Sequence, residues 1–182
     1  MEQRDIALTR NPDDLYGQAV EQFGQSLTRL AAAYEADQSH RQDLLQEIHL
    51  ALWRSFAGFN NQCSLRTWVY RVAQNTAATH VRQHKRVRLS QLVSLEELSE
   101  IPDEFDSVKQ LNESIVLDRI GVLLRRLKSI DRDVLLMYLE GMEAAEIADI
   151  VGISASNVAQ KVHRTKKFLQ NYFLAGGDHG HS

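Results

Sequence analysis

The sequence has very few residues that break helices or crosslink the chain. Among 182 residues there are only two prolines, Pro12 and Pro102, and one cysteine, Cys63. A lone cysteine excludes an internal disulfide framework and fits a reducing cytoplasm. Neither proline nor glycine occurs between Phe59 and Ile101. Such long stretches without breakers favour helices over strands joined by tight turns. The sequence therefore predicts an all-helical protein.

Segments typical of membranes, metal sites and enzymes are also missing. No apolar run approaches the roughly 18 residues needed to cross a bilayer, and the N-terminal segment lacks the apolar centre of a signal peptide. None of the histidines has cysteine partners at zinc spacing, and His179 and His181 lie in a glycine-rich tail that we expect to fray. No nucleophile–base pair or phosphate-binding glycine loop is visible. We therefore predict a cytoplasmic protein that is not an enzyme, needs no cofactor and does not insert into membranes.

The formal net charge of −3 conceals a strong segregation of charge along the chain. Residues 65–88 and residues 153–170 are basic and contain no acidic residue, whereas residues 89–118 carry eight acidic residues against Lys109 alone. Two basic blocks separated by an acidic stretch indicate two surfaces that face polyanions and a connector between them. The alternative for each block is a solvated helix face. Two blocks that both lack acids fit that alternative less well.

Apolar periodicity divides the chain into two helical clusters. Apolar residues at three- and four-residue steps predict helices over about 15–34, about 42–57 and from Ser64 onward, separated by a polar break at 35–41 and a loop at 58–63. The Ser64 hydroxyl is placed to cap the third helix. On that helix Trp68 shares the apolar stripe, which favours core packing over base stacking, whereas for Tyr70 both roles stay open.

A second cluster follows an acidic linker. Residues 87–112 lack a sustained period, apart from one possible helical turn near 95–98. Helices are then predicted over 115–127 and 131–139, the second capped from Ser129 or Asp131 and ended by Gly141. The unbroken apolar run at its end indicates a helix buried on most sides.

Residues 143–169 form the most specific local pattern. A short helix from Glu143 to Val151, a turn around Gly152 and a longer basic helix capped by Ser154 make a helix-turn-helix, whose second helix enters the DNA major groove. Polar side chains expected to be exposed there, and able to pair with base edges, are Ser156, Asn157, Gln160, Lys161, His163 and Arg164. Lys166 and Lys167 suit phosphate contacts. The alternative is a helical hairpin that binds protein.

Two segments together resemble a known family. DLLQEIHLALWRSF (43–56) followed by SLRTWVYRVAQNTAATHVRQHKR (64–86) resembles region 2 of bacterial RNA polymerase sigma factors, and residues 127–169 are similar to region 4. The short separation resembles the extracytoplasmic-function (ECF) group. The resemblance implies an all-α fold with two small helical domains: region 2 at 1–86, an acidic linker at 87–112, region 4 at 113–174 and a flexible tail at 175–182.

The resemblance also implies a role for each matching position. The residues that would bind the polymerase are Asp43, Gln46, Glu47 and Leu50. The residues that would hold the melted minus-ten element, where a base is flipped from the stack and cations displace counterions, are Asn60, Asn61, Gln62, Ser64, Arg66, Arg71, Asn75, Arg82, Lys85 and Arg86. The residues that would bind the minus-thirty-five element are Ser156, Asn157, Gln160, Lys161, His163, Arg164 and Lys167. The implied partners are core RNA polymerase, promoter DNA and, as in many members of the group, an anti-sigma factor.

Some positions depart from the family pattern. Gln42 stands where an acidic residue is usual and Arg41 where a small one is usual, so the polymerase-binding edge is less negative. Ala159 replaces a common cation in the recognition helix, which shifts base contacts toward Gln160 and His163. Ser39 is a candidate phosphorylation site that would restore negative charge, whereas Cys63 is best interpreted as a passive loop residue.

Two other functions fit the same pattern. A stand-alone helix-turn-helix regulator would bind duplex DNA tightly without polymerase. A protein-interaction module would direct both basic blocks at an acidic partner and would support no transcription.

Overall fold

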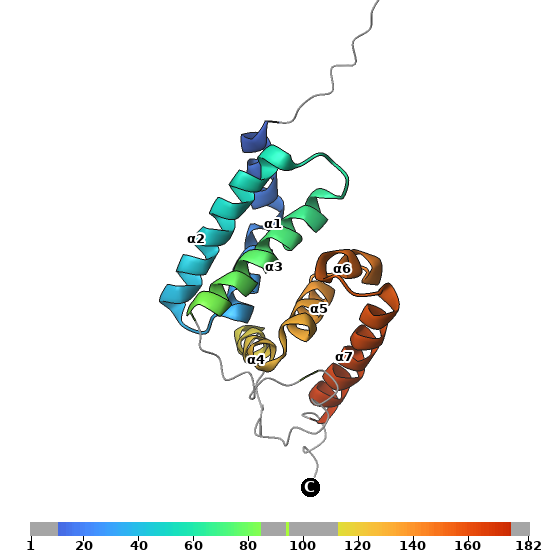
Figure 1. Ribbon diagram of the computed structural model, residues 1–182. Coiled ribbons are helices and arrows are strands. Elements are labelled where there is room, and N and C mark those ends of the chain that lie inside the picture. Colours follow the sequence, from blue (N-terminus) through green and yellow to red (C-terminus); the bar gives the residue numbers. More distant parts are fainter. Residues whose placement is uncertain (1–10, 85–93, 95–112, 176–182) are drawn as a thin grey trace, which may run out of the picture.

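The computed structural model of the chain describes residues 11–84, 94 and 113–175. Every regular element in these ranges is a helix (Figure 1). None of the described helices is long and apolar enough to cross a membrane, and the described side chains include no group of three or more potential metal ligands. The linker at 87–112 with its helical turn, and the tail, lie outside the described residues apart from Ser94 and residue 175.

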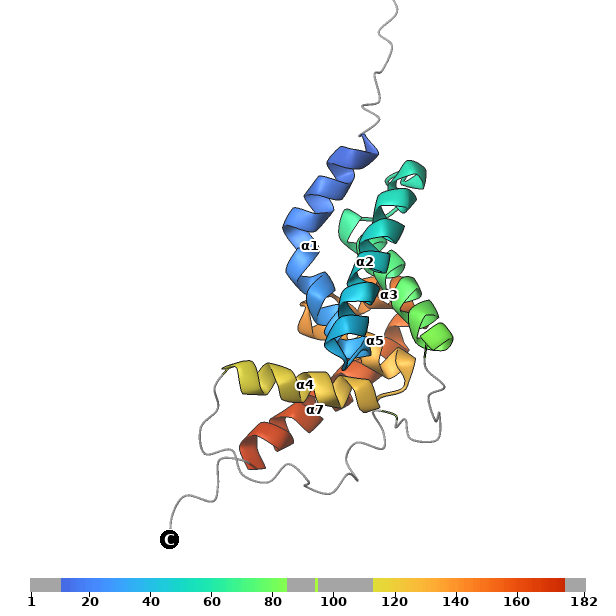
Figure 2. The same cartoon turned by 90° about the vertical axis from the view of Figure 1, so that its left-hand side faces the viewer.

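The first unit is a bundle of three helices. It consists of α1 (Pro12–Tyr34), α2 (Gln38–Ser55) with a 3₁₀ turn η1 (Phe56–Gly58), and α3 (Leu65–His84). Each long helix contacts the other two, as the views in Figures 1 and 2 agree. The bundle closes over fully buried apolar side chains that come from all three helices: Leu27, Leu30, Leu44, Ile48, Leu52, Val69 and Ala73.

Side-chain caps explain where these helices begin. Asn11 accepts a hydrogen bond from the Asp13 N–H at 3.2 Å, and Pro12 occupies the first turn, where its missing N–H costs nothing. Asp37 caps α2 through the His40 N–H at 3.0 Å, so the predicted polar break is shorter and α2 begins earlier than predicted. The Ser64 hydroxyl accepts from the Thr67 N–H at 3.0 Å, which confirms the predicted cap of α3.

The second unit contains α4 (Glu113–Arg126), α5 (Ser129–Leu139), α6 (Ala144–Val151) and α7 (Ala155–Ala175). The apolar run 134–139 is buried as predicted over Val134–Met137, but not at its end, where Leu139 is 42% exposed. The predicted cap of α5 is wrong, because the cap position is Lys128 and no side chain bonds there. Arg132 instead donates back to the carbonyls of Leu124 and Leu127, both at 2.9 Å, and so satisfies the end of α4.

The helix-turn-helix has the predicted bend. α6 ends at Gly152, whose φ of 73° and ψ of 32° place it in the left-handed region. The Ser154 hydroxyl then accepts from the Asn157 N–H at 3.2 Å and caps α7, as predicted. α7 continues to Ala175, beyond the predicted end of the basic helix.

The two units dock against each other, which the sequence does not predict. α1 contacts α4 and α5, and α3 contacts α6 (Figures 1 and 2). Buried apolar residues of both units form one continuous cluster. The chain therefore has the two predicted helical units, but they share an interface.

The conformation of Gly152 predicts the effect of an alanine there. A side chain in the left-handed region costs about 1–2 kcal/mol, so Gly152→Ala should lower the free energy of unfolding by that amount. Gly17→Ala is the matched control, because Gly17 lies inside α1 with nothing within 4 Å of an added Cβ. It should raise stability by about 0.5–1 kcal/mol. Urea denaturation followed by circular dichroism measures both, and a neutral Gly152→Ala would contradict the bend.

Candidate nucleic-acid and polymerase interfaces

The loop before α3 presents polar side chains to solvent. Asn60, Asn61, Gln62 and Ser64 are all exposed. Asn61 has a φ of 60°, which asparagine tolerates better than most residues, and the Asn60 side chain accepts from the Gln62 N–H at 3.3 Å. The turn is therefore built locally, and its amide groups remain available to a ligand.

The aromatic residues near this loop pack inward. The Trp68 indole N–H donates to the Ser55 hydroxyl at 2.9 Å, and its ring lies 5.2 Å from that of Phe59. Tyr70 is 1% exposed and packs edge-on against Phe23. The prediction that Trp68 packs in the bundle is confirmed, and burial also removes Tyr70 from any stacking role.

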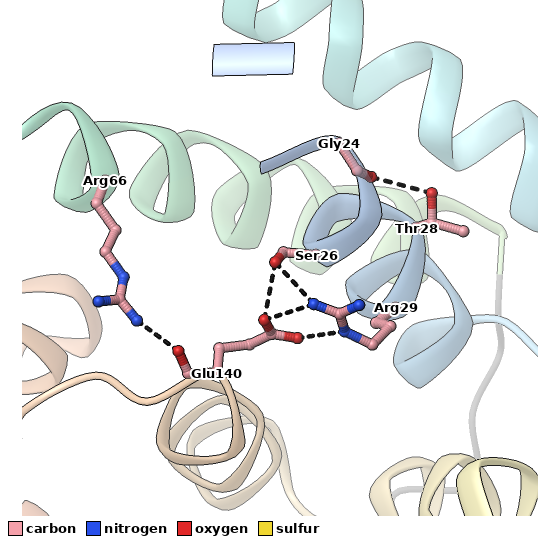
Figure 3. A network of polar contacts seen from close by, with 6 residues as sticks. All are labelled: Gly24, Ser26, Thr28, Arg29, Arg66 and Glu140. Carbon is pink, nitrogen blue, oxygen red and sulfur yellow. Dashed lines mark hydrogen bonds and ion pairs between the residues drawn. The ribbon is translucent and has the colours of Figure 1, made fainter. Parts of the chain in front are cut away.

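Two of the predicted DNA-binding arginines face the second unit. Arg66 donates to the carbonyl of Glu140 at 2.5 Å (Figure 3), and Arg71 donates to the carbonyl of Asp149 at 3.0 Å. Asn75 and Arg82, further along α3, are exposed. The predicted set on this surface is therefore divided in the docked chain, and Lys85 and Arg86 lie outside the described residues.

Glu140 is the centre of the polar contacts between the units. Its carboxylate accepts two bonds from Arg29, at 2.6 and 2.7 Å, and one from the Ser26 hydroxyl at 2.8 Å (Figure 3). Burial alone would raise the pKa of Glu140, but the bonds from Arg29 and Ser26 outweigh it, so that its pKa lies below the usual value. The residue thus remains charged and paired. An acidic residue after an apolar run carries no sequence signal for such a contact.

A buried carboxyl forms a second contact between the units. Asp133 of α5 accepts hydrogen bonds from the Tyr34 hydroxyl of α1 and from the Gln74 amide of α3, the latter at 2.9 Å. The Arg132 guanidinium lies over the Tyr34 ring, 4.6 Å from its centroid. Burial raises the pKa of Asp133 from 3.8 to about 6, although these hydrogen bonds and Arg132 oppose the shift. No pattern in the sequence indicated Asp133, Tyr34 and Gln74 as a group.

The four predicted polymerase-binding residues share one surface. Asp43, Gln46, Glu47 and Leu50 line a shallow depression on α2. Leu50 is 48% exposed, which is unusual for a large apolar side chain without a partner. His80 of α3 completes the depression, and its Nδ1 lies 3.0 Å from the Glu47 carboxylate. The sequence did not indicate His80.

The recognition helix presents most of its predicted residues outward. Ser156, Gln160, His163 and Arg164 line a shallow groove with Ala159, and Asn157 and Lys167 are also exposed. Lys161 is the exception, because its side chain is only 14% exposed and pairs with Asp131 at 2.5 Å. The expected exposure of Lys161 is therefore wrong. The buried Asp131 carboxylate holds it against α5, while its contact with DNA stays a prediction.

Sequence comparisons match both units to one family. The profile of Sigma-70 region 2 matches residues 19–87, and that of Sigma-70 region 4 matches residues 117–169. The RNA polymerase sigma factor NccH of Alcaligenes xylosoxydans xylosoxydans is 25% identical over 157 residues, covering 85% of this chain and 84% of that protein. The ECF RNA polymerase sigma factor SigG of Mycobacterium tuberculosis is 30% identical over 159 residues, covering 75% of this chain.

The matched proteins differ in length, and a solved structure supports the fold. This chain spans 43% of SigG and 40% of another matched relative. The sigma factor RpoE, solved in complex with the anti-sigma factor NepR from Bartonella quintana, superposes with a TM-score of 0.62. The match covers 90% of this chain and 98% of that one at 17% identity, so that it supports the fold alone.

The raised pKa of Asp133 predicts that docking depends on pH. A carboxyl that binds protons more readily when docked than when free favours docking below pH about 4, and this contribution is lost as the pH rises through 6. The charged or titratable groups that face it are Arg132 of α5 and Tyr34 of α1, since Gln74 of α3 is neutral. The contribution is on the order of 1–3 kcal/mol. The radius of gyration from small-angle scattering should rise between pH 5 and pH 7.

Asp133→Asn is the matched control for this pH dependence. An amide keeps the size and much of the hydrogen bonding of the carboxyl but does not titrate in this range. The variant should therefore stay docked at pH 7 and change little in radius. An equal rise in both proteins would assign the effect to other groups.

Proposed function

Because the chain belongs to the ECF group of the sigma-70 family of RNA polymerase sigma factors, we propose that it binds core RNA polymerase and directs it to promoters. The observation that carries this proposal is the pairing, in family order, of a region 2 bundle with a region 4 helix-turn-helix whose recognition face is exposed. A lone helix-turn-helix would fit many kinds of DNA-binding protein, but two matching units fit a single family, the sigma factors.

In this proposal α7 reads the minus-thirty-five element in the major groove. The amides of Asn157 and Gln160 suit adenine, and Arg164 suits guanine. Lys167 lies further along the helix and suits a phosphate, which fixes position without specifying sequence. The cap at Ser154 fixes the start of α7 and hence which of its side chains reach the bases.

The loop Asn60–Ser64 and the outer face of α3 bind the melted minus-ten element. Removing a base from the stack costs a few kcal/mol, and hydrogen bonds in the pocket must offset this cost. The exposed amides of the loop can make such bonds. Arg66, Arg71 and Arg82, followed by Lys85 and Arg86, supply the cations that release counterions from the backbone.

The depression on α2 binds the polymerase. An exposed leucine surrounded by Asp43, Gln46 and Glu47 combines an apolar anchor with negative charge. Such complementary charge sets orientation and association rate more than affinity. In this proposal the protein acts in the cytoplasm beside the polymerase, without catalytic activity or cofactor. An anti-sigma factor binds it, as NepR binds RpoE in the solved complex.

Run-off transcription tests the proposal directly. Purified core polymerase on templates with randomised promoters should give discrete start sites only when this protein is added. Recovered templates should share two motifs upstream of the start. Absence of transcription from any promoter would favour a protein-interaction module, and tight duplex binding without polymerase would favour a stand-alone regulator.

Two variants separate the proposed surfaces, and each is the control for the other. Arg164→Ala removes a base-reading group and should cost about 1–3 kcal/mol in upstream recognition while core binding is unchanged. Glu47→Lys reverses a charge in the depression and should weaken core binding about tenfold, or 1.4 kcal/mol, while sequence preference is unchanged. Fluorescence anisotropy with core polymerase and selection from random templates measure the two effects. Exchange of the two results would contradict the assignment.

A further inference from the structure

A buried histidine supports the depression on α2 from the neighbouring helix. His80 of α3 is only 3% exposed, whereas the Glu47 side chain beside it is 44% exposed. The two helices lie side by side (Figures 1 and 2), and the Nδ1 of His80 is 3.0 Å from a carboxylate oxygen of Glu47. An ionised carboxylate can only accept hydrogen bonds, so the ring nitrogen is the donor. An exposed acidic side chain of α2 is therefore tied to a fixed group inside the bundle.

This hydrogen bond also offsets an unfavourable feature of α2. Asp43 and Glu47 are separated by one helical turn and share a face of the helix, where like charges repel. His40, which also lines the depression, faces other acids instead, since its Nδ1 lies 3.7 Å from Glu35 and 3.8 Å from Asp37. The donor from α3 lets α2 carry two neighbouring acids while one of them keeps a defined position.

Fixing the Glu47 side chain before binding favours recognition of a partner. Glutamate is a flexible side chain, and ordering such a side chain at an interface lowers the affinity by about two- to twelvefold. When His80 holds the carboxylate, the ordering takes place during folding of the bundle and no longer opposes binding. The carboxylate then meets a basic partner in a single orientation.

From these observations we propose that His80 is a positioning residue of the polymerase-binding surface, where it holds the Glu47 carboxylate in the orientation that core RNA polymerase binds. This inference rests on the proposed function, because it requires that the depression on α2 contacts the polymerase. The burial of His80 leaves it little surface to offer a partner directly. It acts through Glu47.

A double-mutant cycle on core binding tests the proposal. His80→Leu removes the donor and should weaken binding of the full-length chain to core polymerase about three- to tenfold. Glu47→Ala removes the acceptor, and adding His80→Leu to it should change the affinity by less than about twofold. Fluorescence anisotropy measures all four proteins. His80→Asn, whose amide nitrogen stands near the position of Nδ1, should restore binding.

Binding rates separate positioning from charge. His80→Leu leaves the charge of Glu47 in place, so the association rate should be unchanged while dissociation becomes faster. Glu47→Ala should also slow association, because it removes a charge that steers the encounter. Stopped-flow fluorescence measures both rates.

His49→Leu is the matched control for the loss of a histidine. His49 also lies on α2, is half-buried and is hydrogen-bonded to the Tyr16 hydroxyl at 3.1 Å, but it lies outside the depression. The variant should lose stability without losing affinity for the polymerase. Urea denaturation followed by circular dichroism compares its stability with that of His80→Leu. If leucine prevents folding, His80→Phe repeats the test, because it keeps a planar ring without the donor.

The outcomes distinguish this inference from the proposed function. An equal loss of affinity from His80→Leu with and without Glu47 overturns the positioning role, because His80 would then act on the fold or on another group. Unchanged affinity of His80→Leu overturns it as well. Both results leave the promoter function in place, since the original protein still binds the polymerase. Absence of core binding by the original protein overturns the proposed function and this inference together.

Discussion

Glu140, the C-cap of α5, connects three helices of the two units. Its side chain is bound by Arg29 and Ser26 of α1, while its main-chain carbonyl accepts from Arg66 of α3. The carboxylate is paired with Arg29, whose side chain remains 46% exposed. The ion pair therefore forms without complete loss of water. Partly hydrated pairs of this kind contribute modestly to stability.

Asp133 differs from Glu140 in that its side chain is almost fully buried. Burial destabilises the charged carboxylate, and the hydrogen bonds and the Arg132 charge only partly offset this cost. The pKa of Asp133 therefore rises to about 6. Near neutral pH the docked state thus contains a strained charge beside a favourable one at Glu140. The units also share a continuous cluster of buried apolar residues, so these two carboxylates are only part of the interface.

Local patterns predicted most of the individual helices and much of the candidate site. The caps at Ser64 and Ser154 and the bend at Gly152 were predictable because each depends on one residue and its immediate neighbours. The cap of α5 was not, because Arg132 satisfies the end of the preceding helix and Asp131 is paired with Lys161 thirty residues away. The same ion pair buries a lysine that helical periodicity placed on the exposed face. These errors arise where a side chain finds a distant partner.

The sequence by itself determined the two helical units, the helix-turn-helix and the family, since periodicity, caps and motif spacing act within short windows of chain. It also predicted most of the exposed polar side chains of the recognition helix, although not the pairing of Lys161 with Asp131. Only the tertiary structure decided that the units dock and that Arg66 and Arg71 bind helix ends. The physical reason is that the docking contacts join residues 59 to 114 positions apart, and no periodic pattern in the sequence indicates contacts at such separations.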